Sequence, residues 1–209
     1  MALKANALVT LAKAKSHLGI STTSLDSRIE QIVNTASQVI ESYTSRKLVT
    51  QSHTEIIDGR STNKLLLGQY PITGGPATGN LPQVFIDASS IFDAATEIDT
   101  DQYRVEKNNL LVRVNRIWGK GYQNIKVIYN AGIGDLVTDD IPADLEWATL
   151  EVVSWYYNTT SNHRIGVLSQ GKLGESVSFE QLMPEHILML LEPYKRCEFP
   201  LAPVQMKNE

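Results

Sequence analysis

Apolar residues recur at helical spacing in two long segments that lie far apart in the chain. The first segment, 24–46, carries an apolar stripe made of Leu25, Ile29, Ile32, Val33, Ala36, Ile40 and Tyr43. The second begins at Pro142 and continues through Leu145, Trp147, Leu150, Val153 and Tyr157. This spacing predicts two amphipathic helices. Shorter helices are predicted over 10–18, where Gly19 would end the helix, and after Pro184.

Between these helices the pattern changes to short apolar or alternating runs separated by turn residues. Strands are predicted over 50–58, 64–67, 83–87, 103–106, 110–114 and 124–129, with a hairpin turn at Asn108-Asn109. A further short strand is predicted over 176–179. The Pro and Gly residues of 71–82 predict an exposed loop. The order of elements therefore predicts an α+β fold, a bundle of three to four helices with an inserted antiparallel β domain.

This pattern divides the chain into four expected parts. Residues 1–48 are expected to form the N-terminal helices of the body, and 136–196 the helices that complete it. Residues 49–135 form the β insertion, and 197–209 an extended tail that contains Pro200 and Pro203. At the start of the long first helix, the side chain of Thr23 or Ser24 is expected to cap a free backbone N–H.

Composition and charge narrow the function classes. The 209 residues are 42% hydrophobic and 20% charged, as in an ordinary soluble globular protein. The net charge of −4 argues against general nucleic-acid binding, because surfaces that neutralise phosphates are basic. Cys197 is the single cysteine, so no intramolecular disulfide can form. The chain shows no secretory signal pattern and no apolar run long enough for a transmembrane helix.

Two glycine motifs lack the positions that nucleotide binding requires. In the segment 166–173, Leu173 replaces the Ser or Thr that would bind Mg²⁺ in a P-loop. In the segment 132–137, Val137 replaces the third glycine of a dinucleotide fingerprint, so a strand-to-helix turn explains it better. The histidines are scattered, without the paired spacing of a metal site. We therefore expect no enzyme activity, no cofactor and no metal.

Large aromatic residues leave two interpretations open. Trp147 and Trp155 lie roughly on one face of the predicted helix. Core packing is the simpler interpretation. A subunit interface is the more specific one, because large aromatics are enriched at binding hot spots. Trp118 with Tyr122 on a loop is the feature that favours a small-ligand or carbohydrate-binding module.

Four segments carry a resemblance to a known family through their order and spacing. They are the helical stretch 9–46 ending in Tyr43-Thr-Ser-Arg46, then Val127-Ile-Tyr-Asn-Ala-Gly132, Ile141-Pro-Ala-Asp-Leu-Glu-Trp-Ala148, and the stretch 182–196 ending in Leu190-Leu-Glu-Pro-Tyr-Lys-Arg196. Together they resemble the head–tail connector proteins of tailed bacteriophages, also called adaptor or head-completion proteins, in the longer form with a β insertion.

The resemblance implies a structural role in the neck of a virion that is assembled in the host cytoplasm. In such proteins about a dozen copies form a ring beneath the portal at the capsid vertex, which extends the DNA channel and receives the tail. The implied partners are the portal protein, a stopper or tail-terminator protein, further copies of the chain, and double-stranded DNA that passes without being read. No membrane is involved. The helices would form the ring body, and the C-terminal segment would reach the portal.

On this basis we expect ring contacts from the helices 24–46 and 142–158, and portal contacts from roughly 171–205. The candidate interface residues are Arg28, Glu41, Arg46, Trp147, Trp155, Lys172, Tyr194, Lys195, Arg196 and Phe199. Two alternatives stay open at this point. One is a tail-completion or stopper protein of the neck, and the other is the small-ligand or carbohydrate-binding module.

Overall fold

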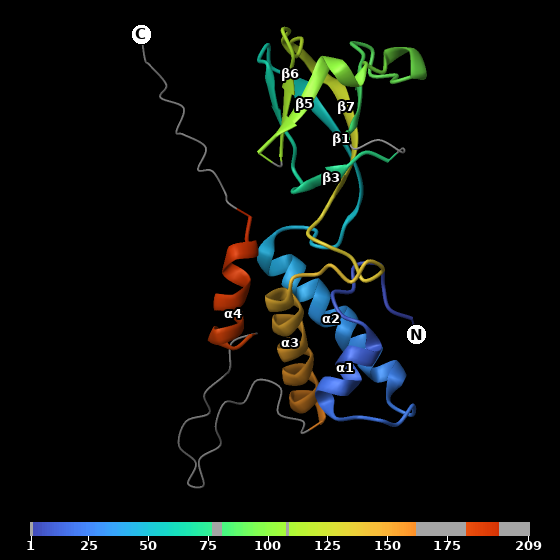
Figure 1. The fold of residues 1–209 in the computed structure, drawn as a ribbon, viewed down its shortest axis with the longest axis vertical. Helices are drawn as coiled ribbons and strands as arrows, with labels where there is room; N and C mark the ends of the chain where they lie inside the picture. The colour runs from blue at the N-terminus through green and yellow to red at the C-terminus, as the bar shows by residue number, and fades with distance from the viewer. Residues whose placement is uncertain (1, 77–80, 108, 162–182, 197–209) are drawn as a thin grey trace.

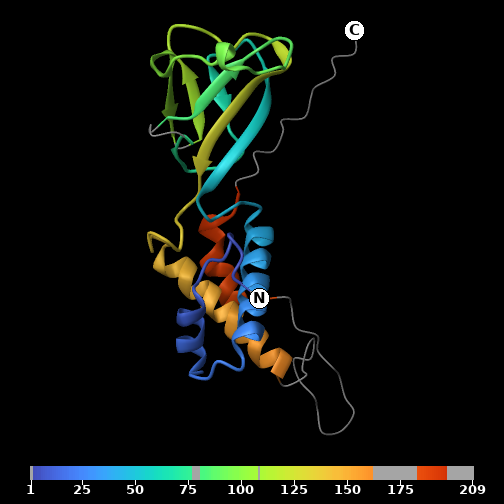
Figure 2. The same cartoon turned by 90° about the vertical axis from the view of Figure 1, so that its right-hand side faces the viewer.

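Two separate hydrophobic cores divide the protein into a helical lobe and a β lobe, seen below and above in Figure 1. The computed structural model describes residues 2–76, 81–107, 109–161 and 183–196. The predicted strand 176–179 and the glycine motif 166–173 lie outside these residues. The lobes are joined where β1 begins and β7 ends, as Figure 2 shows. Helices and antiparallel sheets coexist, so the predicted α+β class is confirmed.

The helical lobe is built from segments at both ends of the chain. Its helices are α1 (Leu11–Leu18), α2 (Asp26–Thr44), α3 (Ala143–Ser161) and α4 (Glu185–Leu191), and α4 runs into the 3-10 helix η3 (Glu192–Tyr194). The apolar stripe of α2 supplies the fully buried Ile29, Val33, Ala36 and Ile40, which share one core with α3 and α4. None of the described helices is long and apolar enough to cross a membrane.

The helix ends show where local sequence rules hold and where they fail. Thr10 caps α1 by accepting a hydrogen bond from the Lys13 backbone N–H at 3.2 Å, and Gly19 ends the helix with φ 68°. The expected cap of α2 by Thr23 or Ser24 is wrong. The N-cap is Leu25, with no side-chain hydrogen bond, and the carbonyl of Thr23 accepts from the Asp26 N–H instead. A backbone turn thus takes over the role of the side-chain cap.

The β lobe contains two antiparallel sheets that enclose the second core. In the first sheet, β7 (Gly121–Ala131) pairs with β1 (Gln51–Gly59), β3 (Ile72–Gly74) and β4 (Gln83–Ile86). In the second, β6 (Leu110–Arg113) lies between β2 (Lys64–Leu66) and β5 (Tyr103–Glu106). The 3-10 turns η1 (Ala94–Thr96) and η2 (Thr100–Gln102) precede β5. The predicted hairpin of β5 and β6 is confirmed by the pairing of Tyr103 with Arg113.

The segment 71–82 differs from its prediction as an exposed loop. Within its described part it contributes β3, and Gly74, Gly75 and Pro82 are buried. Ile72 pairs with Ala131 at the end of β7, and the Asn130 side chain donates to the Gly75 carbonyl at 3.0 Å. A partner strand distant in sequence therefore orders a segment whose composition alone indicates a loop.

The chain crosses between the lobes through a close backbone contact. The Thr50 N–H donates to the Gly134 carbonyl at 2.9 Å, and the Ile133 N–H donates to the Leu48 carbonyl at 2.8 Å. Gly132 has φ +157°, and a Cβ on it would lie 2.3 Å from the Thr50 Cα. Only glycine allows this approach, which explains Gly132, the first glycine of the 132–137 motif, without a bound nucleotide. The motif is a turn between strand β7 and helix α3.

Candidate functional site

Arg46 occupies the junction between the two lobes. Its side chain is buried, and its Nη1 donates to the Tyr194 carbonyl at 3.2 Å while Nη2 donates to the Tyr70 carbonyl. The guanidinium carbon lies 3.7 Å from the centre of the Tyr70 ring. Tyr70 belongs to the β lobe and Tyr194 to η3. One cation therefore holds the end of α2, the β lobe and the C-terminal helical segment together.

Glu41, in the last turns of α2 and five residues before Arg46, extends this junction. Its buried carboxylate accepts hydrogen bonds from the Asn6 side chain at 3.0 Å and from the Lys47 Nζ at 2.8 Å. The Lys47 backbone N–H in turn donates to the Gln69 side chain of the β lobe at 3.1 Å. The sequence marks Glu41 and Arg46 as interface candidates, and the structure places both side chains in contacts within the chain.

The segment 194–196 lies against the ends of α2 and α3. The Tyr194 hydroxyl donates to an Asp144 carboxylate oxygen at 2.6 Å, and burial together with this contact raises the pKa of Tyr194. The Lys195 Nζ lies 5.1 Å from the Tyr43 ring centre, and the Arg196 backbone N–H donates to the Thr44 carbonyl at 2.8 Å. The structure thus brings Arg46 and 194–196 together, while the side chains of Lys195 and Arg196 stay exposed.

The remaining described candidates lie along α2 and α3. The Arg28 guanidinium carbon is 5.6 Å from the Tyr157 ring centre, which links the two helices. Trp155 is half-buried and meets Tyr156 edge to face at 4.9 Å between ring centres. Trp147 is 53% exposed, so core packing does not account for it. Lys172 and Phe199 lie outside the described residues.

Trp147 sits within a charged contact between α1 and α3. Its ring meets that of His17 edge to face at 5.4 Å. The Lys13 Nζ on α1 lies 2.7 Å from an Asp139 carboxylate oxygen and 3.0 Å from one of Glu146. These two hydrogen bonds, that to Asp139 first, raise the pKa of Lys13. These polar contacts join α1 to α3 and to the segment that precedes it, and they leave Trp147 half exposed.

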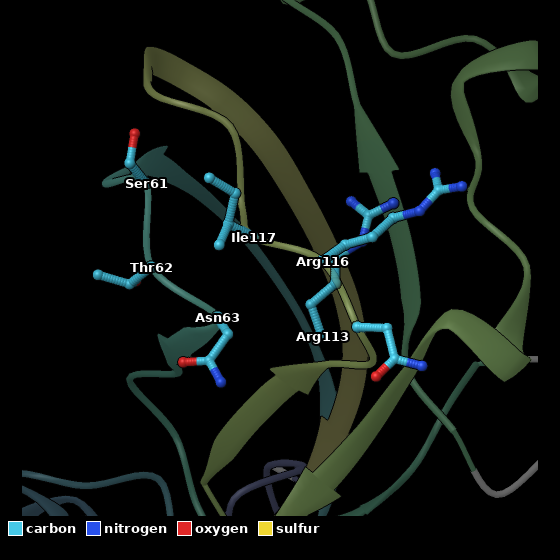
Figure 3. Close-up of a pocket in the computed structure, with 7 residues that line it drawn as sticks. Ser61, Thr62, Asn63, Arg113, Arg116 and Ile117 are labelled. Atoms are coloured by element: carbon cyan, nitrogen blue, oxygen red, sulfur yellow. The ribbon is translucent and has the colours of Figure 1, made fainter.

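The sequence does not single out the pocket at the edge of the β lobe. Its volume is about 610 Å³, and its lining residues are Ser61, Thr62, Asn63, Arg113, Asn115, Arg116 and Ile117. In Figure 3, Arg113 and Arg116 extend to one side, and Ser61 to Asn63 lie on the facing segment. The lining holds neither a carboxylate nor a histidine, so it offers no base to activate a hydroxyl.

Trp118 and Tyr122, the feature that favoured the carbohydrate-binding alternative, do not form a shared exposed aromatic surface. Trp118 is fully buried, and its indole N–H donates to the Asn63 carbonyl at 3.1 Å. Tyr122, in contrast, is 78% exposed. A buried indole presents no face to a ligand, so the feature that favoured a carbohydrate-binding module is removed. Within the described part of the chain, no group of three or more His, Cys, Asp or Glu side chains is placed to hold a metal ion.

Comparison with known proteins decides the family. Residues 7–197 match the head completion protein family. The chain belongs to this family. The resemblance to connector and head-completion proteins seen in the sequence is therefore confirmed. No curated protein matches this head completion protein closely enough to add to that assignment.

Solved structures with the same fold come from gene transfer agent (GTA) particles. A chain from the neck of an empty GTA particle, computed with C6 symmetry, has a TM-score of 0.63 at 17% identity, covering 95% of this chain and 94% of the other. A chain from the virion of a native GTA particle scores 0.62 at 15% identity, with the same coverage. A chain from the neck of a native particle, computed with C12 symmetry, scores 0.61 at 16% identity, again covering 95% and 94%. These similarities span both lobes.

Proposed function

We propose that this head completion protein is an adaptor of the virion neck. About twelve copies form a ring under the portal, and the ring joins the capsid vertex to the tail and extends the DNA channel. The observation that carries the proposal is the similarity of fold over 95% of the chain to a component of a particle neck computed with C12 symmetry. The protein acts as a structural part of the particle, and the proposal includes no catalytic step, cofactor or metal.

In this proposal the four parts of the chain have separate tasks. Residues 1–48 and 136–196 build the ring body, 49–135 project from it, and 197–209 form the tail. Neighbouring copies meet through the helices 24–46 and 142–158, where Trp147 is 53% exposed on α3. A half-exposed tryptophan supports an interface there, because such residues are enriched at binding hot spots. The Arg46 junction supports a ring of uniform geometry, because it fixes one lobe to the other in each copy.

The partners follow from the position of the ring. Segment 171–205, with Lys172, Tyr194, Lys195, Arg196 and Phe199, contacts the portal, and a stopper or tail-terminator protein binds the opposite side. Double-stranded DNA passes through without sequence-specific contacts. The net charge of −4 supports this passage, because an acidic protein does not retain phosphates. The protein is assembled into the neck in the host cytoplasm and needs no membrane.

The test combines the purified protein with the portal protein of the same genome and images the mixture by electron microscopy. A disc of about twelve copies under each portal is the expected result. Well-formed portals with nothing attached would overturn the adaptor role and favour a stopper or tail-completion protein on the tail side.

Truncation tests the portal-binding segment. A chain that lacks 197–209 is expected to lose portal attachment and to keep the circular dichroism spectrum and melting temperature of the full chain. Replacing Lys4 by Glu serves as the control, because this exposed residue lies at the other end of the chain. Retained attachment of the truncated chain would reject the assignment of the tail to the portal.

A further inference from the structure

Two loops that are distant in sequence meet at the far end of the β lobe. The Arg113 backbone N–H donates to the Asn63 carbonyl at 2.8 Å, and the Trp118 backbone N–H donates to the Thr62 carbonyl at 2.7 Å. β1 ends and β7 begins at this place, so it lies away from the junction with the helical lobe (Figure 1). The fold therefore sets the loop after β1 beside the loop after β6, and the pocket of Figure 3 lies between them.

These two loops carry a local excess of positive charge. The segments 59–64 and 113–122 together contain five Lys or Arg residues and no Asp or Glu, although the net charge of the whole chain is −4. The five are Arg60, Lys64, Arg113, Arg116 and Lys120. Arg113 and Arg116 line the pocket itself. A cluster of one sign within an acidic protein attracts anions to that place.

Arg113 is the buried cation of this pocket. It is only 8% exposed, and its buried Nε has no hydrogen-bond partner among the described residues. One terminal nitrogen donates to the Gln102 side-chain oxygen at 3.0 Å, and the guanidinium carbon lies 5.2 Å from the Trp118 ring centre. A buried cation that no carboxylate contacts is costly, so an anion bound beside it is stabilising.

The acidic segment beside the pocket reaches this cation only through a neutral amide. The Gln102 side-chain nitrogen donates to an Asp99 carboxylate oxygen at 3.3 Å, while the Gln102 oxygen accepts from Arg113. Asp99 therefore orients the amide that holds Arg113. In the part of the chain that the structure describes, neither Arg113 nor Arg116 forms an ion pair. The pocket thus keeps the charge of both arginines.

Arg116 places its positive charge close to that of Arg113. In Figure 3 the two side chains run in the same direction from the end of β6 and the loop that follows it. Burial first, and then the charge of Arg116, lower the pKa of Arg113. Two guanidinium groups that disfavour each other's charge are relieved by a ligand that brings about two negative charges.

A phosphate group fits this pocket better than a carboxylate does. A phosphate carries a charge of about −1.5 to −2 at neutral pH and has three strong acceptor oxygens, whereas a carboxylate carries a single negative charge. The pocket lining also includes Ser61 and Asn115, whose hydroxyl and amide groups can donate hydrogen bonds. The charge and the donors at the pocket are therefore those that a dianionic phosphate requires.

We propose that the pocket lined by Arg113 and Arg116 binds a dianionic phosphate, either the free ion or a terminal phosphate ester. The two arginines supply the positive charge, and Ser61 and Asn115 donate to the remaining oxygens. The bound anion links the loop after β1 to the loop after β6. The site is independent of the adaptor role proposed above.

Isothermal titration calorimetry of the full chain with inorganic phosphate tests the site. At about pH 8, where phosphate carries nearly two negative charges, we expect a dissociation constant of about 1 mM. Arg116→Gln is expected to weaken binding about tenfold or more, and this exposed residue can be changed without disturbing the core. Arg104→Gln is the matched control, because it removes an exposed arginine outside the pocket lining, and it should leave binding unchanged. Ionic strength is kept constant with sodium chloride, so that screening is equal throughout.

Two short DNA duplexes, one with 5′-phosphates and one without, distinguish the sources of phosphate. Binding of the inorganic ion but of neither duplex would support the site and assign it to the free ion. Preference for the 5′-phosphorylated duplex would support it and assign it to a terminal ester. Equal binding of the two duplexes without binding of the ion would show contacts with the DNA backbone, and the dianion site would be wrong.

Three further results would overturn the site. They are the absence of binding by any phosphate, acetate binding as tight as that of phosphate, and equal phosphate affinity in Arg116→Gln and the unchanged protein. Discs under the portal in electron micrographs, together with any of these results, would leave the adaptor role standing. Phosphate binding without discs would overturn the adaptor role and leave the phosphate site standing.

Discussion

The guanidinium of Arg46 lies 3.7 Å above the ring of Tyr70, across the boundary between the helical and β lobes. The same guanidinium donates to the carbonyls of Tyr70 and Tyr194, so three distant parts of the chain meet at one side chain. The planar fork of arginine can serve two acceptors and stack on an aromatic ring simultaneously, which lysine cannot do. The relative placement of the lobes therefore depends on this residue.

Replacement of Arg46 by Met is expected to lower the free energy of unfolding by about 2–4 kcal/mol, because buried carbonyls lose charged donors. Arg46→Lys should recover only part of this loss. Urea denaturation followed by circular dichroism measures both. Arg104→Met is the control, because Arg104 is exposed and, among the described residues, forms an ion pair with Glu106 on the same strand, so its loss should stay within about 0.5 kcal/mol. Equal losses at the two positions would contradict the role given to Arg46.

Gly132 is expected to tolerate no side chain. A Cβ there would lie 2.3 Å from the Thr50 Cα at φ +157°, so Gly132→Ala must displace the connection between the lobes. We expect a loss of about 2–4 kcal/mol in thermal or urea unfolding. Gly119→Ala is the matched control, because a Cβ at Gly119 meets nothing within 4 Å, and it should change stability by no more than about 0.5 kcal/mol. If Gly132→Ala left the free energy of unfolding unchanged, the close approach of Gly132 to Thr50 would not be required by the fold.

Tyr103 is expected to contribute to loss of stability at alkaline pH. Burial raises its pKa from 10.0 to about 12, with a smaller contribution from Glu97, and its hydroxyl donates to the Pro82 carbonyl. Above pH 10 the unfolded chain ionises this tyrosine while the folded chain keeps it neutral. The stabilisation is thus complete below pH 10 and is lost as the pH rises toward 12.

The measurement compares unfolding of the unchanged protein and Tyr103→Phe in urea at several pH values. Between pH 10 and 12 the slope of unfolding free energy against pH should be shallower in the variant by about 1.4 kcal/mol per pH unit. Other tyrosines with raised pKa values act equally in both proteins, so the difference isolates Tyr103. Identical slopes would mean that the hydroxyl of Tyr103 is not held neutral by the fold.

Trp147 and Trp118 are expected to respond in opposite ways to truncation. Trp147 is 53% exposed, so Trp147→Ala should cost less than about 1 kcal/mol in stability and should weaken ring formation. Trp118 is fully buried, so Trp118→Ala should cost about 3–5 kcal/mol. Thermal denaturation measures the change in stability of both variants, and mass photometry measures ring formation by Trp147→Ala. Ring formation by Trp147→Ala at the level of the unchanged protein would remove α3 from the proposed contacts.

Local pattern was sufficient to predict most of the elements. The apolar stripe of α2 and the glycine that ends α1, Gly19, depend on neighbours within a few residues, so they predict helices directly. The strand predicted over 50–58 is shifted by one residue in the structure, where β1 is Gln51–Gly59, and the strand predicted over 124–129 is longer, since β7 runs from Gly121 to Ala131. Pairing with β1, from Gly59 with Gly121 to Gln51 with Ala131, extends β7 beyond the alternation visible in its own sequence.

The candidate site was far less predictable, because its contacts join residues that are distant in sequence. Burial of Trp118 and Arg113 depends on how the two sheets close around them, and neither has a local signature of burial. In the sequence, Arg46 and Glu41 look like surface charges near a helix end. In the structure, contacts with Tyr70 and Tyr194 bury Arg46, and a contact with Asn6 helps to bury Glu41.

The sequence by itself determined the order of helices and strands, the α+β class and the family, because apolar periodicity and short spaced motifs are sufficient to predict them. Tertiary structure decided that 71–82 contributes a strand, that Trp118 is covered, and that Arg113 and Arg116 line one pocket. The physical reason is that hydrophobic period is a property of neighbouring residues, whereas burial and charge pairing depend on which distant segments the fold brings together.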